Sequence, residues 1–144
     1  MKAVVDTNVV LSGLLWTGPP NRLLRWARRG IIEVLTCEEA VEELKRVLEY
    51  RKFGERLKGL GATPREVLAY FMNLAHFVPN PESVPSEITE DPFDNLFLAL
   101  ALENSAHLIV SGDHHLIQLR EYRHIQIVIP SEACRVIEKS GRPE

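Results

Sequence analysis

The stretch that most constrains the fold is residues 2–8, which read Lys-Ala-Val-Val-Asp-Thr-Asn. Val4 and Val5 form a short apolar run that ends in an acid, a pattern typical of a strand buried on both faces of a sheet. In open α/β sheets, ligands bind just beyond the carboxyl ends of the strands, which makes Asp6 a candidate site residue. Taken alone, Asp6 is better explained as a turn residue or helix N-cap, because its side chain can accept bonds from nearby backbone N–H groups.

Length and composition indicate one globular domain spanning residues 1–144. Hydrophobic residues make up 45% of the chain and charged residues 26%, and no run approaches the ~18 apolar residues of a membrane span. The chain enters a strand pattern at once and shows no export signal, so Cys37 and Cys134 are expected to be reduced thiols. We therefore expect a cytoplasmic protein with no membrane association.

The net charge of −3 is unusual for a nucleic-acid-binding protein, but the basic residues are clustered. Residues 45–58 hold six bases and two acids, and residues 22–29 hold four arginines and no acid. Two interpretations stay open, solvated helix faces or a sequence-independent grip on RNA phosphates. The candidate RNA-binding side chains are Arg22, Arg25, Arg29, Lys45, Arg46, Arg51 and Lys52. Trp16 and Trp26 could stack on bases, but tryptophans at helix positions are more often in the core, and neither is assigned.

Strand-like and helix-like segments alternate along the chain. Strands are expected over 31–35, 76–78, 107–110 and 125–129, and a loop over 80–90. Helices are expected over 9–15, 21–29, the segment after Thr36, 64–75, 91–102, 116–120 and 130–139. The expected N-caps are Asn21, Thr36 with Glu39 three residues on, Thr63 with Glu66, and Asp91. This alternation predicts a three-layer α/β/α sandwich with a central, mostly parallel sheet.

Three further acids stand at positions that could join Asp6. Asp113 directly follows an apolar strand, and Asp94 lies in the first turn of a helix that is apolar nearly all round. Glu43 flanks the apolar stripe of the helix after Thr36, at 100° per residue, while Glu39 and Glu42 lie farthest from it. Each has an ordinary alternative, since first-turn acids stabilise the helix dipole and boundary glutamates are mostly solvated. Capping alone explains Asp91.

A cluster of carboxylates needs a counter-charge, and oxygen ligands favour hard cations such as Mg²⁺. Two such ions ~3.5–4 Å apart can activate water and hold the leaving oxygen of a phosphodiester. Signatures of serine hydrolases, zinc proteases and phosphate-cradling loops do not occur in the sequence. Thr7, Asn8 and Ser111 could orient a carboxylate or bridge through water. His114 and His115 are expected to be loop residues, because neighbouring side chains rarely point the same way.

Four segments, in order, resemble the PIN-domain family, and within it the branch of VapC-like toxins of toxin–antitoxin systems. They are Val4-Val5-Asp6-Thr7-Asn8-Val9, Glu43-Leu44-x-x-Val47-Leu48, Asp91-Pro92-x-Asp94-Asn95-x-Phe97-Leu98-Ala99-Leu100-Ala101 and Leu108-Ile109-Val110-Ser111-Gly112-Asp113. The resemblance spans residues 3 to about 130. Phe93 departs from it, because close relatives often carry a further acid there.

The resemblance implies a metal-dependent endoribonuclease that uses Mg²⁺ or Mn²⁺. It assigns the catalytic and metal-binding acids to Asp6, Glu43, Asp94 and Asp113. VapC-like toxins are usually homodimers silenced by a small antitoxin protein, so RNA, an antitoxin and a second copy are the expected partners. Two alternatives remain, a non-catalytic PIN-like module that binds RNA or protein, and a small-molecule phosphatase with Asp6 as nucleophile. The phosphatase lacks the acid it needs two residues on, where this chain has Asn8.

Overall fold

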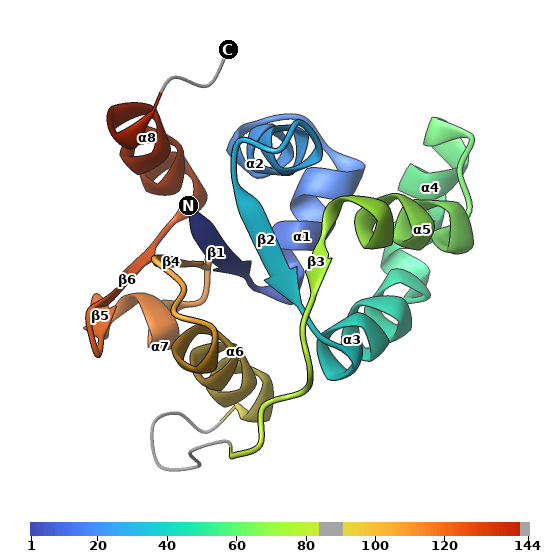
Figure 1. Cartoon of the computed structure of the whole chain (residues 1–144). Helices are drawn as coiled ribbons and strands as arrows, with labels where there is room; N and C mark the ends of the chain where they lie inside the picture. Colours follow the sequence, from blue (N-terminus) through green and yellow to red (C-terminus); the bar gives the residue numbers. More distant parts are fainter. Residues whose placement is uncertain (84–90, 142–144) are drawn as a thin grey trace.

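The first strand, β1 (Lys2–Val5), lies inside the sheet, as its double-sided burial requires. In the computed structural model, which describes residues 1–83 and 91–141, the strands are ordered β3-β2-β1-β4-β6-β5 (Figure 1). All neighbours pair in parallel except β5 and β6. The remaining strands are β2 (Glu33–Thr36), β3 (His76–Phe77), β4 (Leu108–Val110), β5 (Glu121–Tyr122) and β6 (Ile125–Val128).

Helices connect the strands and cover both faces of the sheet (Figure 1). They are α1 (Thr7–Leu15), α2 (Pro19–Arg28), α3 (Glu38–Leu48), α4 (Gly54–Leu60), α5 (Pro64–Leu74), α6 (Pro92–Glu103), α7 (His114–Ile117) and α8 (Pro130–Ser140), with a 3₁₀ turn η1 (Arg51–Phe53) before α4. None of the helices in the described part of the chain is long and apolar enough to cross a membrane.

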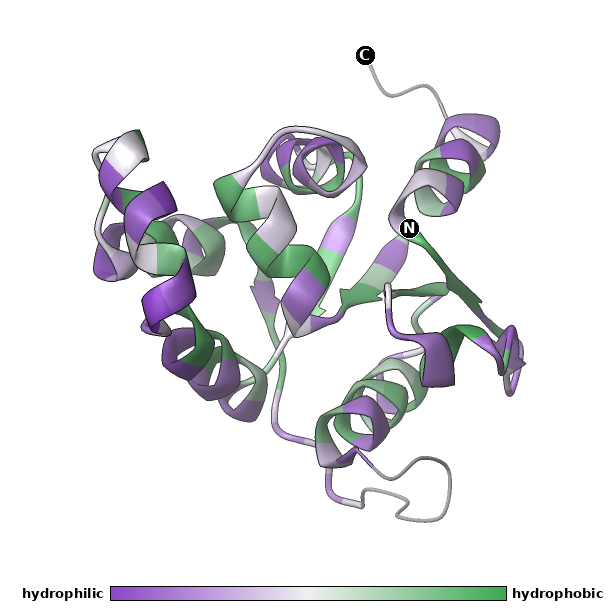
Figure 2. Ribbon diagram, turned by 180° about the vertical axis from the view of Figure 1, so that it is seen from behind, coloured by the Kyte–Doolittle hydropathy of each residue, from purple (hydrophilic) through white to green (hydrophobic). Residues whose placement is uncertain are grey.

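Alternation along the strands divides the interior into two cores. Ala3 and Val5 of β1 face a core shared with α1, α2, α3, α5 and α8. Val4 and Ile109 face the opposite core, which they share with α6 and α7. Figure 2 shows apolar residues concentrated in the strands and in α6, whose residues 94–101 are all buried. The predicted three-layer α/β/α sandwich with a mostly parallel sheet is confirmed.

Two of the expected caps are present and two are wrong. Thr63 forms a complete capping box with Glu66, and Asp91 accepts a bond from the N–H of Phe93 at 2.9 Å. Asn21 does not cap α2, which begins at Pro19, and instead donates from its side chain to Gly13 O at 2.8 Å. This bond helps to hold α2 against α1.

Thr36 is the second wrong cap, because it is the buried last residue of β2 and α3 begins at Glu38. The N–H of Glu39 is satisfied from a distant loop, by Asn80 Oδ1 at 3.1 Å. A cap supplied across 41 residues leaves no local sequence signal.

The structure differs from the expectations at β5 and at α7, and the loop expected over 80–90 is only partly described. β5 was not predicted; it forms a hairpin with β6 through Arg123 and His124, both at positive φ. α7 begins at His114, not at 116, so His114 and His115 are exposed helical residues and not loop residues. Of the loop expected over 80–90, residues 84–90 lie outside the described residues.

Candidate active site

The parallel pairing of β1 and β4 brings their carboxyl ends together at one edge of the sheet. Asp6 directly follows β1, and Asp113 comes three residues after the end of β4. The N-terminus of α6, with Asp91 and Asp94, reaches the same edge. A small pocket of about 70 Å³ forms there, room for about two water molecules at roughly 30 Å³ each. The residues that line it are Asp6, Thr7, Asn8, Glu43, Val47, Asp91, Phe93, Asp94, Phe97 and Asp113.

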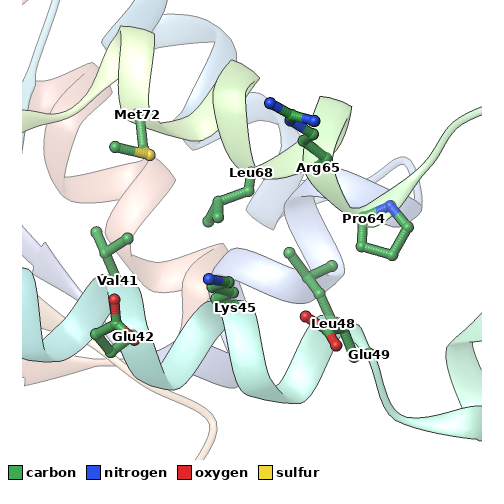
Figure 3. Close-up of a pocket in the computed structure, with 9 residues that line it drawn as sticks. All are labelled: Val41, Glu42, Lys45, Leu48, Glu49, Pro64, Arg65, Leu68 and Met72. Atoms are coloured by element: carbon green, nitrogen blue, oxygen red, sulfur yellow. The ribbon is translucent and has the colours of Figure 1, made fainter.

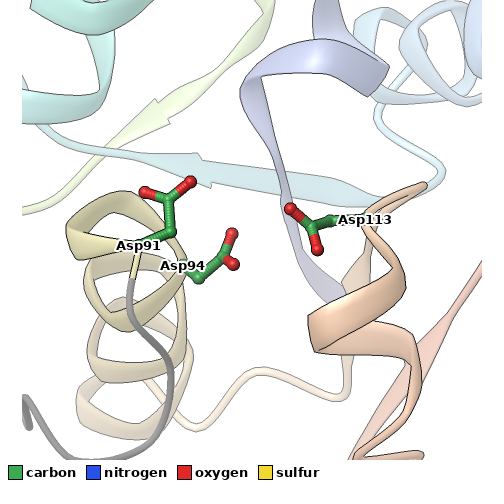
Figure 4. A group of neighbouring side chains, drawn as sticks. All are labelled: Asp91, Asp94 and Asp113. Atoms are coloured by element: carbon green, nitrogen blue, oxygen red, sulfur yellow. The ribbon is translucent and has the colours of Figure 1, made fainter.

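Three carboxylates in this pocket lie close enough to share one cation. Asp91, Asp94 and Asp113 each offer an oxygen, and the three oxygens lie within 4.8 Å of one another (Figure 4). Asp91 was explained from sequence as a cap only, and the structure adds it to the cluster while keeping the cap. Its three-residue spacing from Asp94 at a helix start was the signal that could have identified it, because such residues are neighbours on a helix surface.

Asp6 is buried, with 5% of its surface exposed, and both of its oxygens are engaged. Oδ1 accepts a bond from Val9 N at 2.9 Å, which makes Asp6 the N-cap of α1, and Oδ2 accepts a bond from the hydroxyl of Ser111. Asp6 is therefore both the cap and a wall of the pocket. Each oxygen keeps a second lone pair, so these bonds leave Asp6 able to bind a cation.

Ser111 also accepts a bond from the N–H of Asp113 at 2.8 Å, so one buried hydroxyl joins the two strand-end acids. These two bonds are compatible with the orienting role predicted for Ser111 from sequence, which stays a prediction. The other two candidates for that role, Thr7 and Asn8, line the pocket. Asn8 is exposed, whereas Thr7 is half-buried and its hydroxyl has no hydrogen-bond partner among the described residues.

The electrostatics of the pocket fit a bound cation. Burial raises the pKa of Asp94 to about 6, with further contributions from the negative charges of Asp113, Asp91 and Asp6. Burial also raises the pKa of Asp6, although the bonds from Ser111 and from backbone N–H groups oppose it. Asp94 is 4% exposed, and its buried Oδ2 has no hydrogen-bond partner among the described residues. An unpartnered carboxylate oxygen among three other acids is a position that a divalent ion would satisfy, and oxygen-only donors suit Mg²⁺ or Mn²⁺.

Glu43 lines the same pocket from α3, but its oxygens lie outside the three-aspartate group. Its side chain is 13% exposed and accepts a bond from Arg46, one turn further on. Arg46 thus lies beside the pocket, and it is one of the seven cations suggested for RNA binding. The other six are exposed on α2, directly after it at Arg29, on α3 and on η1, and none of them lines the acidic pocket.

A larger hollow of about 520 Å³ lies between α3 and α5 (Figure 3). Apolar side chains form much of its wall, with Lys45, Glu42 and Arg65 at its rim. Among the described residues it holds no group of three neighbouring carboxylates, so the small pocket is the candidate site.

Comparison with known proteins agrees with the geometry. A family model described as the PIN domain matches residues 2–115, which run from β1 into α7 and include every acid of the pocket. No curated protein matches the chain in a sequence comparison. The match covers well over half of the 144 residues, and the protein belongs to the PIN-domain family.

Proposed function

We propose that this protein is a metal-dependent endoribonuclease and that it acts as the toxin of a toxin–antitoxin pair. PIN domains are generally nucleases, and the acidic cluster of this chain is of the kind that could bind the metal ion. The observation that carries the proposal is the convergence of Asp91, Asp94 and Asp113 within 4.8 Å, in a pocket that Asp6 and Glu43 also line.

In the proposed site, the three clustered aspartates and Asp6 would hold Mg²⁺ or Mn²⁺. The bound ion would lower the pKa of an attacking water and neutralise charge on the scissile phosphate. Ser111 keeps Asp6 oriented by donating to its Oδ2. Glu43 accepts a bond from Arg46 at Oε1, and its second oxygen would accept a hydrogen bond from a water molecule in the pocket.

Val47, Phe93 and Phe97 form apolar walls of the pocket. Such walls strengthen the interactions between the carboxylates and any cation, because they keep the local dielectric low. The pocket is too small for a nucleotide, so only a phosphate group would approach its opening. This geometry suits a chain cut at an exposed phosphodiester.

The test is cleavage of single-stranded RNA in Mg²⁺ or Mn²⁺, compared with the same reaction in EDTA. We expect Asp6→Asn and Asp94→Asn to lose at least 100-fold in rate, as order of magnitude for a lost metal ligand. Glu42→Gln is the matched control, because Glu42 is exposed on the same helix as Glu43 and does not line the acidic pocket. Equal cleavage in EDTA, or by the two aspartate variants, would overturn the proposal.

The toxin role, the antitoxin and the homodimer rest on the resemblance to VapC-like toxins. Inducing the natural chain in a bacterial host should arrest growth, and inducing Asp94→Asn should not. Co-expression of a short reading frame adjacent to the gene should restore growth and yield a complex. Sedimentation of the purified chain tests the dimer. Normal growth with an active nuclease would remove the toxin role and leave the enzyme.

A further inference from the structure

A cluster of aromatic and basic residues lies at the end of α1 that points away from the acidic pocket; Trp16 and Lys52 in it are exposed, and Phe53 and Arg56 are half-buried. Trp16 is the C-cap of α1 and is 43% exposed, whereas Trp26, the second tryptophan, is 7% exposed. The guanidinium of Arg56 lies 5.5 Å from the centroid of the Trp16 ring, and the Phe53 ring meets the same ring edge-on at 6.5 Å. The ammonium of Lys52 lies 5.2 Å from the Phe53 ring.

The guanidinium of Arg56 is held in place and does not hang freely over the ring. Its Nε donates to the carbonyl oxygen of Leu15 at 2.6 Å, the last residue of α1. This bond ties α4 to the end of α1 and fixes a planar cation against an aromatic ring. Tryptophan rings and arginine planes are the groups on which unstacked RNA bases stack. Because this pair is already ordered, its side chains lose little conformational entropy when a base binds.

The charge around this cluster suits a phosphate chain. Arg51, Lys52 and Arg56 lie within six residues of one another, with Glu55 as the acid among them. In the described part of the structure, none of these three cations forms an ion pair with a carboxylate. Arg51 and Lys52, which are exposed, are therefore available to phosphates next to a stacked base, while Arg56 is held against Trp16.

Two helices lead from the acidic pocket to this cluster. Along α1, Asp6 and Trp16 are ten residues apart, about 15 Å at 1.5 Å per residue. Along α3, Val47 lines the pocket and Arg51 begins η1 four residues later. Figure 1 shows α1, α3 and α4 on the same side of the sheet. A few nucleotides of single-stranded RNA would cover this distance.

We propose that Trp16 and Arg56 form a stacking platform for one base of single-stranded RNA, placed a few nucleotides from the phosphate that enters the acidic pocket. This inference deepens the proposed ribonuclease function and rests on it. It selects single strands, because a base inside a duplex cannot expose its face to the platform. It also requires little base preference, since every base has a stacking face.

Tryptophan fluorescence of the full-length chain tests the platform without any cleavage. In Trp26→Phe, Trp16 is the only tryptophan, so excitation selective for tryptophan reports on it alone, and EDTA prevents metal-dependent hydrolysis. Short oligoadenylate should quench the emission of Trp16, while an RNA duplex of the same length and an abasic ribose-phosphate chain should not. If Trp26→Phe does not fold, filter binding of labelled oligoadenylate to the natural chain replaces the fluorescence readout.

Substitutions separate stacking from charge. Trp16→Leu should weaken oligoadenylate binding roughly 10-fold, within the range for one lost base stack, and Trp16→Phe should retain most of the affinity. Lys52→Gln should lower the slope of log K against log salt by about 0.7, as for one phosphate contact on a single strand. Tyr70→Leu is the matched control, because Tyr70 is also exposed and lies 5.5 Å from an arginine, Arg28, but on α5 and α2. Tyr70→Leu should change neither the affinity for oligoadenylate nor the slope of log K against log salt.

Failure of the platform and failure of the nuclease give different results. The platform is overturned, and the enzyme left, if the chain cleaves RNA in a metal-dependent way but oligoadenylate does not quench Trp16. The same holds if it cleaves RNA but Trp16→Leu binds oligoadenylate as tightly as the natural chain. Quenching without cleavage would support the platform and contradict the enzyme. Base stacking is overturned if the abasic chain or an acidic peptide quenches Trp16 as strongly as oligoadenylate does. It is also overturned if raising the protein concentration alone gives the same quenching, because a second copy would then occupy the surface.

Discussion

Replacing Asp94 by asparagine should stabilise the metal-free protein, although it should abolish activity. The pKa of Asp94 is raised from 3.8 to about 6, so ionising this buried carboxyl in the folded state is unfavourable. At about 1.4 kcal/mol for each tenfold change in the acid dissociation constant, this displacement corresponds to about 3 kcal/mol. Asparagine keeps the shape of the side chain and removes the charge. We expect Asp94→Asn to raise the free energy of unfolding by about 2–3 kcal/mol above pH 7.

The sign and the pH window follow from proton binding. Between about pH 4 and pH 6 the folded Asp94 keeps a proton that the unfolded chain has lost, so the free energy of unfolding falls as pH rises. The Asp94→Asn variant lacks this term. The difference in stability between the two proteins should therefore be near zero at about pH 4, and complete above about pH 7.

Added metal at 100 times its dissociation constant should cancel most of this difference, and at 1,000 times, where binding contributes about 4.1 kcal/mol, it should reverse the order. A cation bound at 100 times its dissociation constant stabilises the natural chain by about 2.7 kcal/mol, and the variant should lose most of this gain because it lacks the buried carboxylate. Thermal unfolding in EDTA and in Mn²⁺ measures both effects, at roughly 2–4 °C for each kcal/mol in a domain of this size. The exposed Glu42→Gln is the control and should stay within about 0.5 kcal/mol of the natural chain under both conditions. If Asp94→Asn is no more stable than the natural chain in EDTA above pH 7, the account of Asp94 as a buried, mutually repelling acid is wrong.

Three other substitutions test the hydrogen bonds at the site, the packing of α1 against α2 and the cap of α5. Ser111→Ala removes the hydroxyl that binds Asp6 and the N–H of Asp113; calorimetric titration should show Mn²⁺ affinity about 10–100-fold lower, and an unchanged affinity would refute the orienting role. Gly13→Ala would place a methyl group 2.7 Å from Leu24 Cδ1 and 2.8 Å from the carbonyl oxygen of Pro20, so urea unfolding should show a loss of about 1–3 kcal/mol. Thr63→Ala removes the capping box of α5 and should destabilise the protein by about 1 kcal/mol without changing cleavage; an altered rate would link α5 to the site.

The parts of the fold that sequence predicts are those in which a local pattern and the tertiary structure agree. Val4 and Val5 mark β1 because a strand buried on both faces must be apolar, and the Thr63 box marks α5 because the bonds are only three residues apart. The cap of α3 could not be predicted, since its donor bonds Asn80, 41 residues away. β5 is two residues long and depends on pairing with β6, so it carries no pattern of its own.

Sequence predicts four acids for the site, Asp6, Glu43, Asp94 and Asp113; all four line one pocket, and their role in catalysis stays a prediction. The positions of Asp6 and Asp113 at strand ends follow from the topology of parallel sheets, and both line the pocket. The distances from these two acids to Asp91 and Asp94 depend on how α6 packs against β1 and β4, and sequence periodicity does not specify this packing. For this reason Glu43, expected as an equal member of the cluster, lies at the wall of the pocket beside Arg46, while Asp91 lies within the group of three.

In this fold, a carboxylate that caps a helix can also face the acidic pocket, so capping does not exclude these acids from binding a metal ion. Asp6, Asp91 and Asp113 are the N-caps of α1, α6 and α7, and each uses Oδ1 to accept a backbone N–H, from Val9, Phe93 and His115. The caps fix the orientation of each carboxylate before any ion binds, and the positive ends of the helices reduce the repulsion among them. Asp94 caps nothing and keeps a buried oxygen without a partner among the described residues, and burial together with the charges of the neighbouring acids raises its pKa to about 6. Three helix N-termini directed at one sheet edge thus hold together a set of carboxylates that would otherwise repel one another.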